Sequence, residues 1–175
     1  RSSTSESPHR PRPRSRPFGA ARCADGREGD MKPPGYEVEF DIYGADRADL
    51  WVRGPDGSQV VALLMRMKEL GRSAGKAVAA CLIELAYEET AVAWISDVRA
   101  PASRKGAGIG TTLMVLALDA MREAGVEYAL LDARPPEREN LSRLLSFYRR
   151  HGFVLVRECA GITLDWNLMI AKVSA

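Results

Sequence analysis

The sequence predicts an α/β fold with one mixed sheet. We expect mainly antiparallel strands in the N-terminal half, a central β-loop-α-β crossover, and a C-terminal helix followed by a hairpin. Two observations carry this prediction. Short runs of β-type residues alternate with turn residues between positions 36 and 100, and a glycine-rich loop at 105–111 precedes apolar residues at helical spacing. A length of 175 residues and a hydrophobic fraction of 46% suit a single globular domain.

Residues 1–30 differ from the rest of the chain in composition. They are rich in Ser, Pro, Arg and Gly and hold almost no large apolar residues, so they bury too little surface to offset the entropy of ordering. We therefore expect a disordered leader at 1–30 and a folded domain at 31–175. The methionine at position 31 suggests that the natural chain starts there. An arginine-rich arm that binds nucleic acid is the alternative for the leader.

Charge and residue counts exclude several classes of protein. The leader contains seven of the 25 Lys and Arg residues and four of the 23 acidic residues, so the folded part is close to neutral and nucleic acid is not an expected partner. Three cysteines and two histidines are too few for a disulfide framework, a metal site or a His-based triad. No apolar run approaches the roughly 18 residues of a membrane span, and the first residues lack a secretory pattern. We expect a cytoplasmic protein.

The first three strands follow from alternation and from one turn cluster. Residues 36–42 alternate apolar and acidic positions, as a half-buried strand does. Residues 49–53 and 59–67 flank the turn sequence Gly54-Pro55-Asp56-Gly57, which predicts a hairpin. A helix that starts at a capping serine and covers residues 58–70 is the alternative for the second arm.

A second pair of strands is predicted at 76–85 and 90–100, joined by residues 87–89. Residues 111–123 then place apolar side chains on one helical face, and Gly125 ends this helix. The near-continuous apolar run 126–133 predicts a buried strand parallel to the one before the helix.

The C-terminal part begins after the break at Arg134-Pro135-Pro136. Apolar residues from Leu141 to Tyr148 repeat on a helical face that ends at His151-Gly152. Residues 153–158 and 164–173 predict the two strands of the last hairpin.

The loop at 105–111 joins a predicted strand to a predicted helix. Amides in the first turn of a helix have no intrahelical partners and carry partial positive charge, so this position attracts phosphate. Glycines let the backbone approach the anion closely. The loop does not fit a Walker motif, because Lys105 precedes the glycines, and Gly106, Gly108 and Gly110 fit the dinucleotide pattern poorly. We expect a diphosphate here.

The same stretch resembles motif A of the GNAT superfamily, read here as Lys105-Gly106-Ala107-Gly108-Ile109-Gly110. Further matches lie at Ile95, Val98 and Ala100 in the preceding strand, and at Asn140, Phe147-Tyr148 and His151-Gly152-Phe153 downstream. The resemblance covers residues 90–158 and implies an acyl-CoA N-acyltransferase fold for 31–175. The two amphipathic helices that this family places between its first two strands have no counterpart in the sequence.

The resemblance implies that acetyl-CoA is the co-substrate. Pantetheine would lie between two splayed strands, and the diphosphate would lie on the glycine loop. The implied cofactor-binding residues are Val98, Arg99, Ala100, Lys105, Gly106, Ala107, Gly108, Ile109, Gly110, Thr111 and Asn140.

The resemblance places Tyr148 near the sulfur of CoA, where it would protonate the leaving thiolate. Asp97 is the first choice for the base that deprotonates the amine, and Glu84 is the second. The alternatives are that Tyr148 packs the last helix onto the sheet and that Asp97 is a solvated strand residue. The implied function is transfer of an acetyl group to a primary amine of a small molecule or peptide. A noncatalytic module that binds CoA or a partner is the alternative function.

Overall fold

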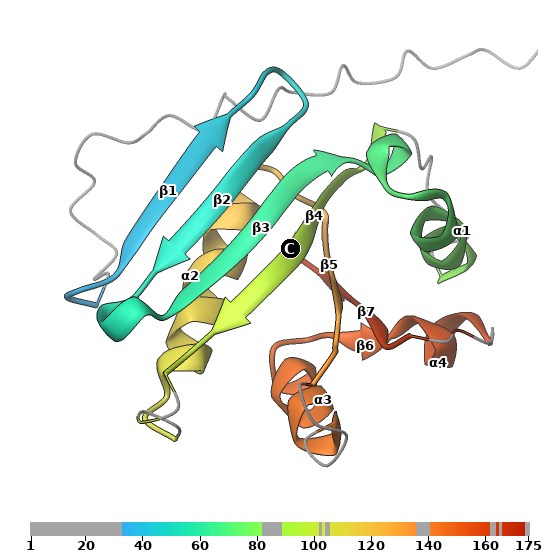
Figure 1. Ribbon diagram of the computed structural model, residues 1–175. Coiled ribbons are helices and arrows are strands. Elements are labelled where there is room, and N and C mark those ends of the chain that lie inside the picture. The colour runs from blue at the N-terminus through green and yellow to red at the C-terminus, as the bar shows by residue number, and fades with distance from the viewer. Residues whose placement is uncertain are drawn as a thin grey trace, which may run out of the picture.

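The computed structural model describes residues 33–81, 89–101, 103, 106–135, 141–161, 164 and 166–173. The predicted leader at 1–30 lies outside these residues. Seven strands form one sheet in the order β1-β2-β3-β4-β5-β7-β6, and helices lie on both faces of it (Figure 1). The predicted mixed α/β fold is confirmed. No helix in the described part of the chain is long and apolar enough to cross a membrane.

Strands β1 (Glu37–Ile42), β2 (Ala48–Arg53) and β3 (Gln59–Arg66) form an antiparallel meander. The predicted hairpin around residues 54–57 is therefore confirmed, and the helical alternative for its second arm is wrong. Every second residue of β3 from Val60 to Leu64 is fully buried, which is the period of a strand that packs one face on a core.

Helix α1 (Arg72–Cys81) occupies most of a segment that we predicted to be a strand. The prediction of a strand at 76–85 is wrong for residues 76–81, and its remainder lies outside the described residues. Helix α1 is rich in alanine, the best helix former, and Val78 is its only β-branched residue. Ala74, Ala77 and Val78 are buried at the i, i+3 and i+4 positions of one helical face.

The central crossover is as predicted. Strand β4 (Ala91–Arg99) leads through the glycine loop to helix α2 (Ile109–Glu123), and β5 (Tyr128–Asp132) returns parallel to β4. Gly125 follows the helix with φ 78°, a left-handed conformation that favours glycine, and its amide donates to the carbonyl of Arg122.

The C-terminal part contains α3 (Leu141–Arg150), β6 (Val154–Leu155), α4 (Val156–Ala160) and β7 (Leu168–Lys172). The predicted helix and the antiparallel pairing of the last two strands are confirmed. The first of these strands is much shorter than predicted, because the chain turns into α4 after Leu155. This turn buries Val156 in the core on the α1 face of the sheet.

The sheet separates two apolar cores, one on each of its faces. On one face, α2 and α3 contribute Leu113, Met114, Met121 and Leu145. On the other face, α1 and α4 pack against the sheet and against each other. The second face carries the side chain of Trp94 from β4.

Candidate active site

Strands β4 and β5 separate part of the way along their length and form a fork. Their parallel pairing runs from Val92–Tyr128 to Ile95–Leu131. Beyond that point, β4 continues beside β3 to Arg99, whereas Asp132 at the end of β5 pairs with Leu168 of β7. The register between β3 and β4 shifts at Ser96, which indicates a bulge. The fork opens a pocket of about 490 Å³, which we call the fork pocket.

The glycine loop enters α2 with two residues in the left-handed region. Gly106 has φ 89° and Gly108 has φ 76°. Gly108 is the N-cap residue, and none of the side chains in the described part of the chain caps the helix. The amide of Thr112 donates to the Gly108 carbonyl at 3.0 Å. A Cβ atom built on either glycine meets no heavy atom of the described residues within 4 Å. The start of α2 therefore offers an approachable, uncapped set of amides, which suits a diphosphate.

Gly110 connects this loop to helix α3. A Cβ atom at Gly110 would lie 3.5 Å from Cζ of Phe147, so the first turn of α2 packs closely on the Phe147 ring. Phe147 in turn makes an edge contact with Tyr148, with 5.2 Å between ring centroids. The two sequence blocks that suggested the function are therefore in physical contact.

Tyr148 lies in the wall of the fork pocket. Its residue is only 7% exposed, and its ring also contacts Phe153 at 5.9 Å between centroids. Burial, with a smaller contribution from the charge of Asp97, raises the pKa of Tyr148 to about 12. The phenol therefore keeps its proton across the ordinary pH range. Tyr148 packs α3 onto the sheet and also presents a proton donor to the pocket.

Asp97 lies in the same pocket, one residue beyond the bulge. Its Oδ2 accepts a hydrogen bond from Nε2 of Gln59 at 2.7 Å and pairs with the guanidinium of Arg99 at 3.2 Å. The side chain is 32% exposed, so it contacts both protein and solvent. Glu84, the second candidate base, lies outside the described residues.

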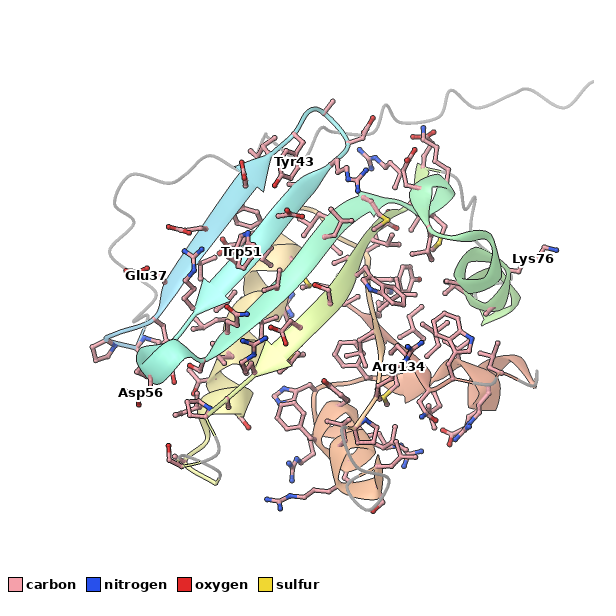
Figure 2. The ribbon with its side chains drawn as sticks, viewed as in Figure 1. Glu37, Tyr43, Trp51, Asp56, Lys76 and Arg134 are labelled. Carbon is pink, nitrogen blue, oxygen red and sulfur yellow. The ribbon has the colours of Figure 1, made fainter. Side chains whose placement is uncertain are left out.

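Asp132 is a residue of the pocket that our sequence analysis missed. Its side chain is 9% exposed, and Oδ2 pairs with Nε of Arg134, which extends from the end of β5 (Figure 2). The other oxygen, Oδ1, is buried and has no hydrogen-bond partner in the described part of the chain. An acidic residue at the carboxyl end of an apolar strand in a parallel crossover is the signal that would have identified it.

The other predicted residues fall into three groups. Val98 lines the fork pocket, and Arg99 and Ala100 follow it at the exposed end of β4. The loop and first helical turn hold Gly106, Ala107, Gly108, Ile109, Gly110 and Thr111, of which Ile109 turns its side chain into the core. Lys105 and Asn140 lie outside the described residues.

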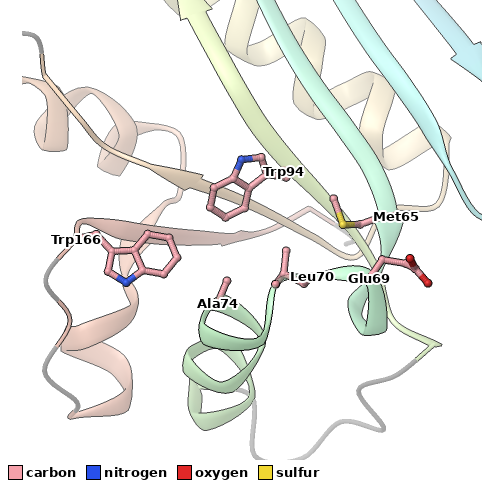
Figure 3. A pocket seen from close by; sticks show the side chains of 7 residues that line it. Met65, Glu69, Leu70, Ala74, Trp94 and Trp166 are labelled. Atoms are coloured by element: carbon pink, nitrogen blue, oxygen red, sulfur yellow. The ribbon is translucent and has the colours of Figure 1, made fainter.

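A second pocket, of about 450 Å³, lies next to the fork pocket on the α1 face of the sheet. Apolar side chains and one glutamate line it: Met65, Glu69, Leu70, Ala74, Trp94 and Trp166, together with Gly71 (Figure 3). We call it the tryptophan pocket. Trp94 and Trp166 line both pockets, with 6.2 Å between ring centroids.

Strands β1 and β2 are joined directly by residues 43–47, so the two helices that the family places there are absent from this connection, as the sequence predicted. Helix α1 follows β3 instead and contributes Ala74 to the tryptophan pocket.

Comparison with known proteins agrees with this geometry. Residues 28–153 match the model of the acetyltransferase (GNAT) family. No curated protein matches the chain.

Solved structures of similar fold include NAA60 from Arabidopsis thaliana in complex with acetyl-CoA. The two proteins are 17% identical over 75% of this chain and 78% of that chain, with a TM-score of 0.48. The same protein with a bisubstrate analogue gives 18% identity at the same coverage and TM-score. Nourseothricin acetyltransferase is 16% identical over 79% of this chain and 84% of that chain, with a TM-score of 0.41.

The family match spans the meander, the fork, the glycine loop and Tyr148. The glycines with left-handed backbone and the helix start of α2 form a backbone arrangement that suits a phosphate group. The chain therefore belongs to the acetyltransferase (GNAT) family, whose acetyl donor is acetyl-CoA.

Proposed function

We propose that this protein transfers the acetyl group of acetyl-CoA to the nitrogen of a primary amine. The observation that carries the proposal is the fork between β4 and β5, which opens a pocket containing Asp97 and Tyr148 beside an uncapped helix start. An acid and a base that face one pocket are the two groups that N-acetyl transfer requires.

The backbone is responsible for most of the donor binding in this proposal. Amides from Gly106 to Thr111 would bind the diphosphate, with Lys105 adding positive charge. Between Ser96 and Arg99, β4 pairs with β3 on one side only, so backbone groups at Val98 and Ala100 can pair with the amides of pantetheine. Such pairing would direct the thioester into the fork pocket, and Asn140 would assist from the start of α3.

The base then acts on the amine, and the acid acts on the sulfur of the thioester. Asp97 accepts a proton from the amine, directly or through one water molecule, as the nitrogen forms a bond to the thioester carbonyl carbon. Tyr148 donates its phenolic proton to the sulfur as the carbon–sulfur bond breaks. The products are an acetamide and free CoA, and solvent returns a proton to Tyr148 and removes one from Asp97.

Two measurements test the donor and the reaction separately. Acetyl-CoA should raise the melting temperature in a dose-dependent way, by several degrees at 100 times its Kd, where binding adds about 2.7 kcal/mol. A thiol-release screen with mixed pools of primary amines should then detect free CoA. No thermal shift at millimolar acetyl-CoA contradicts the proposal. Binding without thiol release from any pool supports the noncatalytic CoA-binding module instead.

Replacement of Asp97 by Asn tests the base. We expect kcat/KM for the amine to fall about 100-fold, because general base catalysis contributes on that order. The acetyl-CoA Kd should stay within twofold. Asp119→Asn is a matched control, since Asp119 is also paired with an arginine but lies on the exposed face of α2. If both variants retain full activity, Asp97 is only a solvated strand residue.

A further inference from the structure

The two pockets differ sharply in chemistry although they share a wall. The fork pocket contains the polar side chains Asp97, Asp132 and Tyr148. The lining of the tryptophan pocket is apolar except at Glu69, whose carboxylate points away from both indole rings (Figure 3). Trp94 and Trp166 belong to both linings, so the two pockets adjoin at these rings.

The tryptophan pocket suits an apolar group of modest size. Its volume of about 450 Å³ exceeds that of a phenyl ring or a branched alkyl chain. Ala74 and Leu70 point toward the tryptophans, and Met65 lies beyond Trp94 on the side away from Trp166 (Figure 3). An apolar ligand group gains free energy there by leaving water. A polar group would lose its hydrogen bonds with water and gain few from these side chains.

Asp132 supplies a complementary polar end. Its side chain is only 9% exposed, yet Oδ1 accepts no hydrogen bond from the described residues. Buried carboxylate oxygens are nearly always hydrogen-bonded, so Oδ1 of this pocket-lining residue needs a donor, and a ligand that carries N–H groups can supply one. A primary amine or its ammonium form is such a donor.

We infer that the acetyl acceptor is a small primary amine with an apolar substituent. The nitrogen donates to Oδ1 of Asp132 in the fork pocket, and the aliphatic or aromatic substituent lies between Trp94, Trp166 and Ala74. This assignment rests on the proposed N-acetyltransferase function. A small amine fits better than a peptide terminus, because the side chains of the tryptophan pocket offer no set of partners for successive peptide groups.

Matched amines test the substituent. Butylamine and 2-methoxyethylamine have the same length, but butylamine has a methylene group where 2-methoxyethylamine has an ether oxygen. At equal concentrations of free base, we expect kcat/KM to be about tenfold higher for butylamine, and higher again for 2-phenylethylamine. A peptide that begins with Phe should be a poorer substrate than 2-phenylethylamine.

Variants test the two pockets. Ala74→Leu fills the tryptophan pocket and should lower kcat/KM for 2-phenylethylamine about tenfold. Lys76→Leu places the same side chain on the exposed face of α1, where Lys76 points away from the sheet (Figure 2). This variant should leave kcat/KM unchanged for both 2-phenylethylamine and butylamine. Asp132→Asn should raise the KM of every amine about tenfold or more. The acetyl-CoA Kd, measured for each variant, shows that the protein is folded and should stay within twofold.

The outcomes separate this inference from the function on which it rests. Equal or faster turnover of 2-methoxyethylamine, or preference for the peptide, overturns the apolar small-amine assignment and leaves N-acetyl transfer standing. Equal loss with Ala74→Leu and Lys76→Leu also overturns it. Acetyl-CoA binding without turnover of any amine overturns both.

Discussion

Replacement of Gly108 by valine should raise the Kd of acetyl-CoA about 100-fold or more. Gly108 caps α2 with φ 76°, and the space in front of its Cα is open. A valine there forces a β-branched residue into the left-handed region and places two methyl groups where the diphosphate would approach the amides. The loss of two hydrogen bonds to a charged group, each worth about 1.5 kcal/mol or more, corresponds to about 100-fold. Isothermal titration with acetyl-CoA measures the effect.

Gly125 provides a matched control for this variant. It follows the other end of α2 with φ 78°, and a Cβ atom there also meets nothing within 4 Å. Gly125→Val should therefore cost a similar 1–3 kcal/mol of backbone strain and lower the melting temperature by a similar amount. Its acetyl-CoA Kd should match that of the wild type. Equal Kd values for the two variants would show that the loop does not bind the diphosphate.

Replacement of Tyr148 by phenylalanine should lower kcat by about 100- to 1,000-fold. The change removes one hydroxyl from the wall of the fork pocket and keeps the ring contacts with Phe147 and Phe153. A positioned general acid contributes on this order to the rate. The acetyl-CoA Kd should stay within twofold, because no donor-binding contact is lost. A stopped assay of thiol release under saturating amine gives kcat directly.

Tyr43→Phe is a control, because it also removes a tyrosine hydroxyl but does so outside the fork pocket. The pKa of Tyr43 is also raised to about 12, by hydrogen bonds to Asp49 and Asp41. Tyr43 lies at the turn between β1 and β2, far from Arg134 and the fork (Figure 2). Tyr43→Phe should leave kcat unchanged. If Tyr148→Phe also retains full kcat, Tyr148 only packs α3 onto the sheet.

The raised pKa of Tyr148 sets the expected pH dependence. An ordinary tyrosine loses its proton near pH 10, whereas Tyr148 keeps its proton until about pH 12. Activity should therefore show no decrease near pH 10 from ionisation of this acid. The same shift contributes stability to the folded state that is fully present below pH 10 and is lost as the pH rises towards 12. Chemical denaturation of wild type and Tyr148→Phe between pH 9 and 11 should show this loss only in the wild type.

Local sequence was sufficient for the crossover. The glycine loop, the helical spacing after it and the apolar run 126–133 each point to one local structure, and the observed α2 and β5 agree with all three. The left-handed conformations at Gly106 and Gly108 also belong to the local chain, because only glycine adopts them without strain. The loop, the helix and the strand can therefore be predicted from residues that are neighbours in the sequence.

The segment at 72–81 shows where local sequence was ambiguous. Its alanines favour a helix, but its run of small apolar residues also fits a buried strand. In the structure Ala74, Ala77 and Val78 lie on one helical face and pack into the core between α1, the sheet and α4. Likewise, the sequence predicts that Val156 belongs to a strand. In the structure the chain turns into α4 at this point and buries Val156 in the core on the α1 face.

The sequence by itself was enough to predict the proposed donor site, because a diphosphate cradle is made of consecutive backbone amides and a short run of glycines encodes it. Only the tertiary structure brought together the residues of the proposed acceptor site. Asp132, Trp94 and Trp166 come from three separate segments and meet because β4 and β5 diverge and α1 covers the opposite face. Side chains that come from segments distant in sequence share no spacing, so their pocket becomes visible only when the sheet is formed.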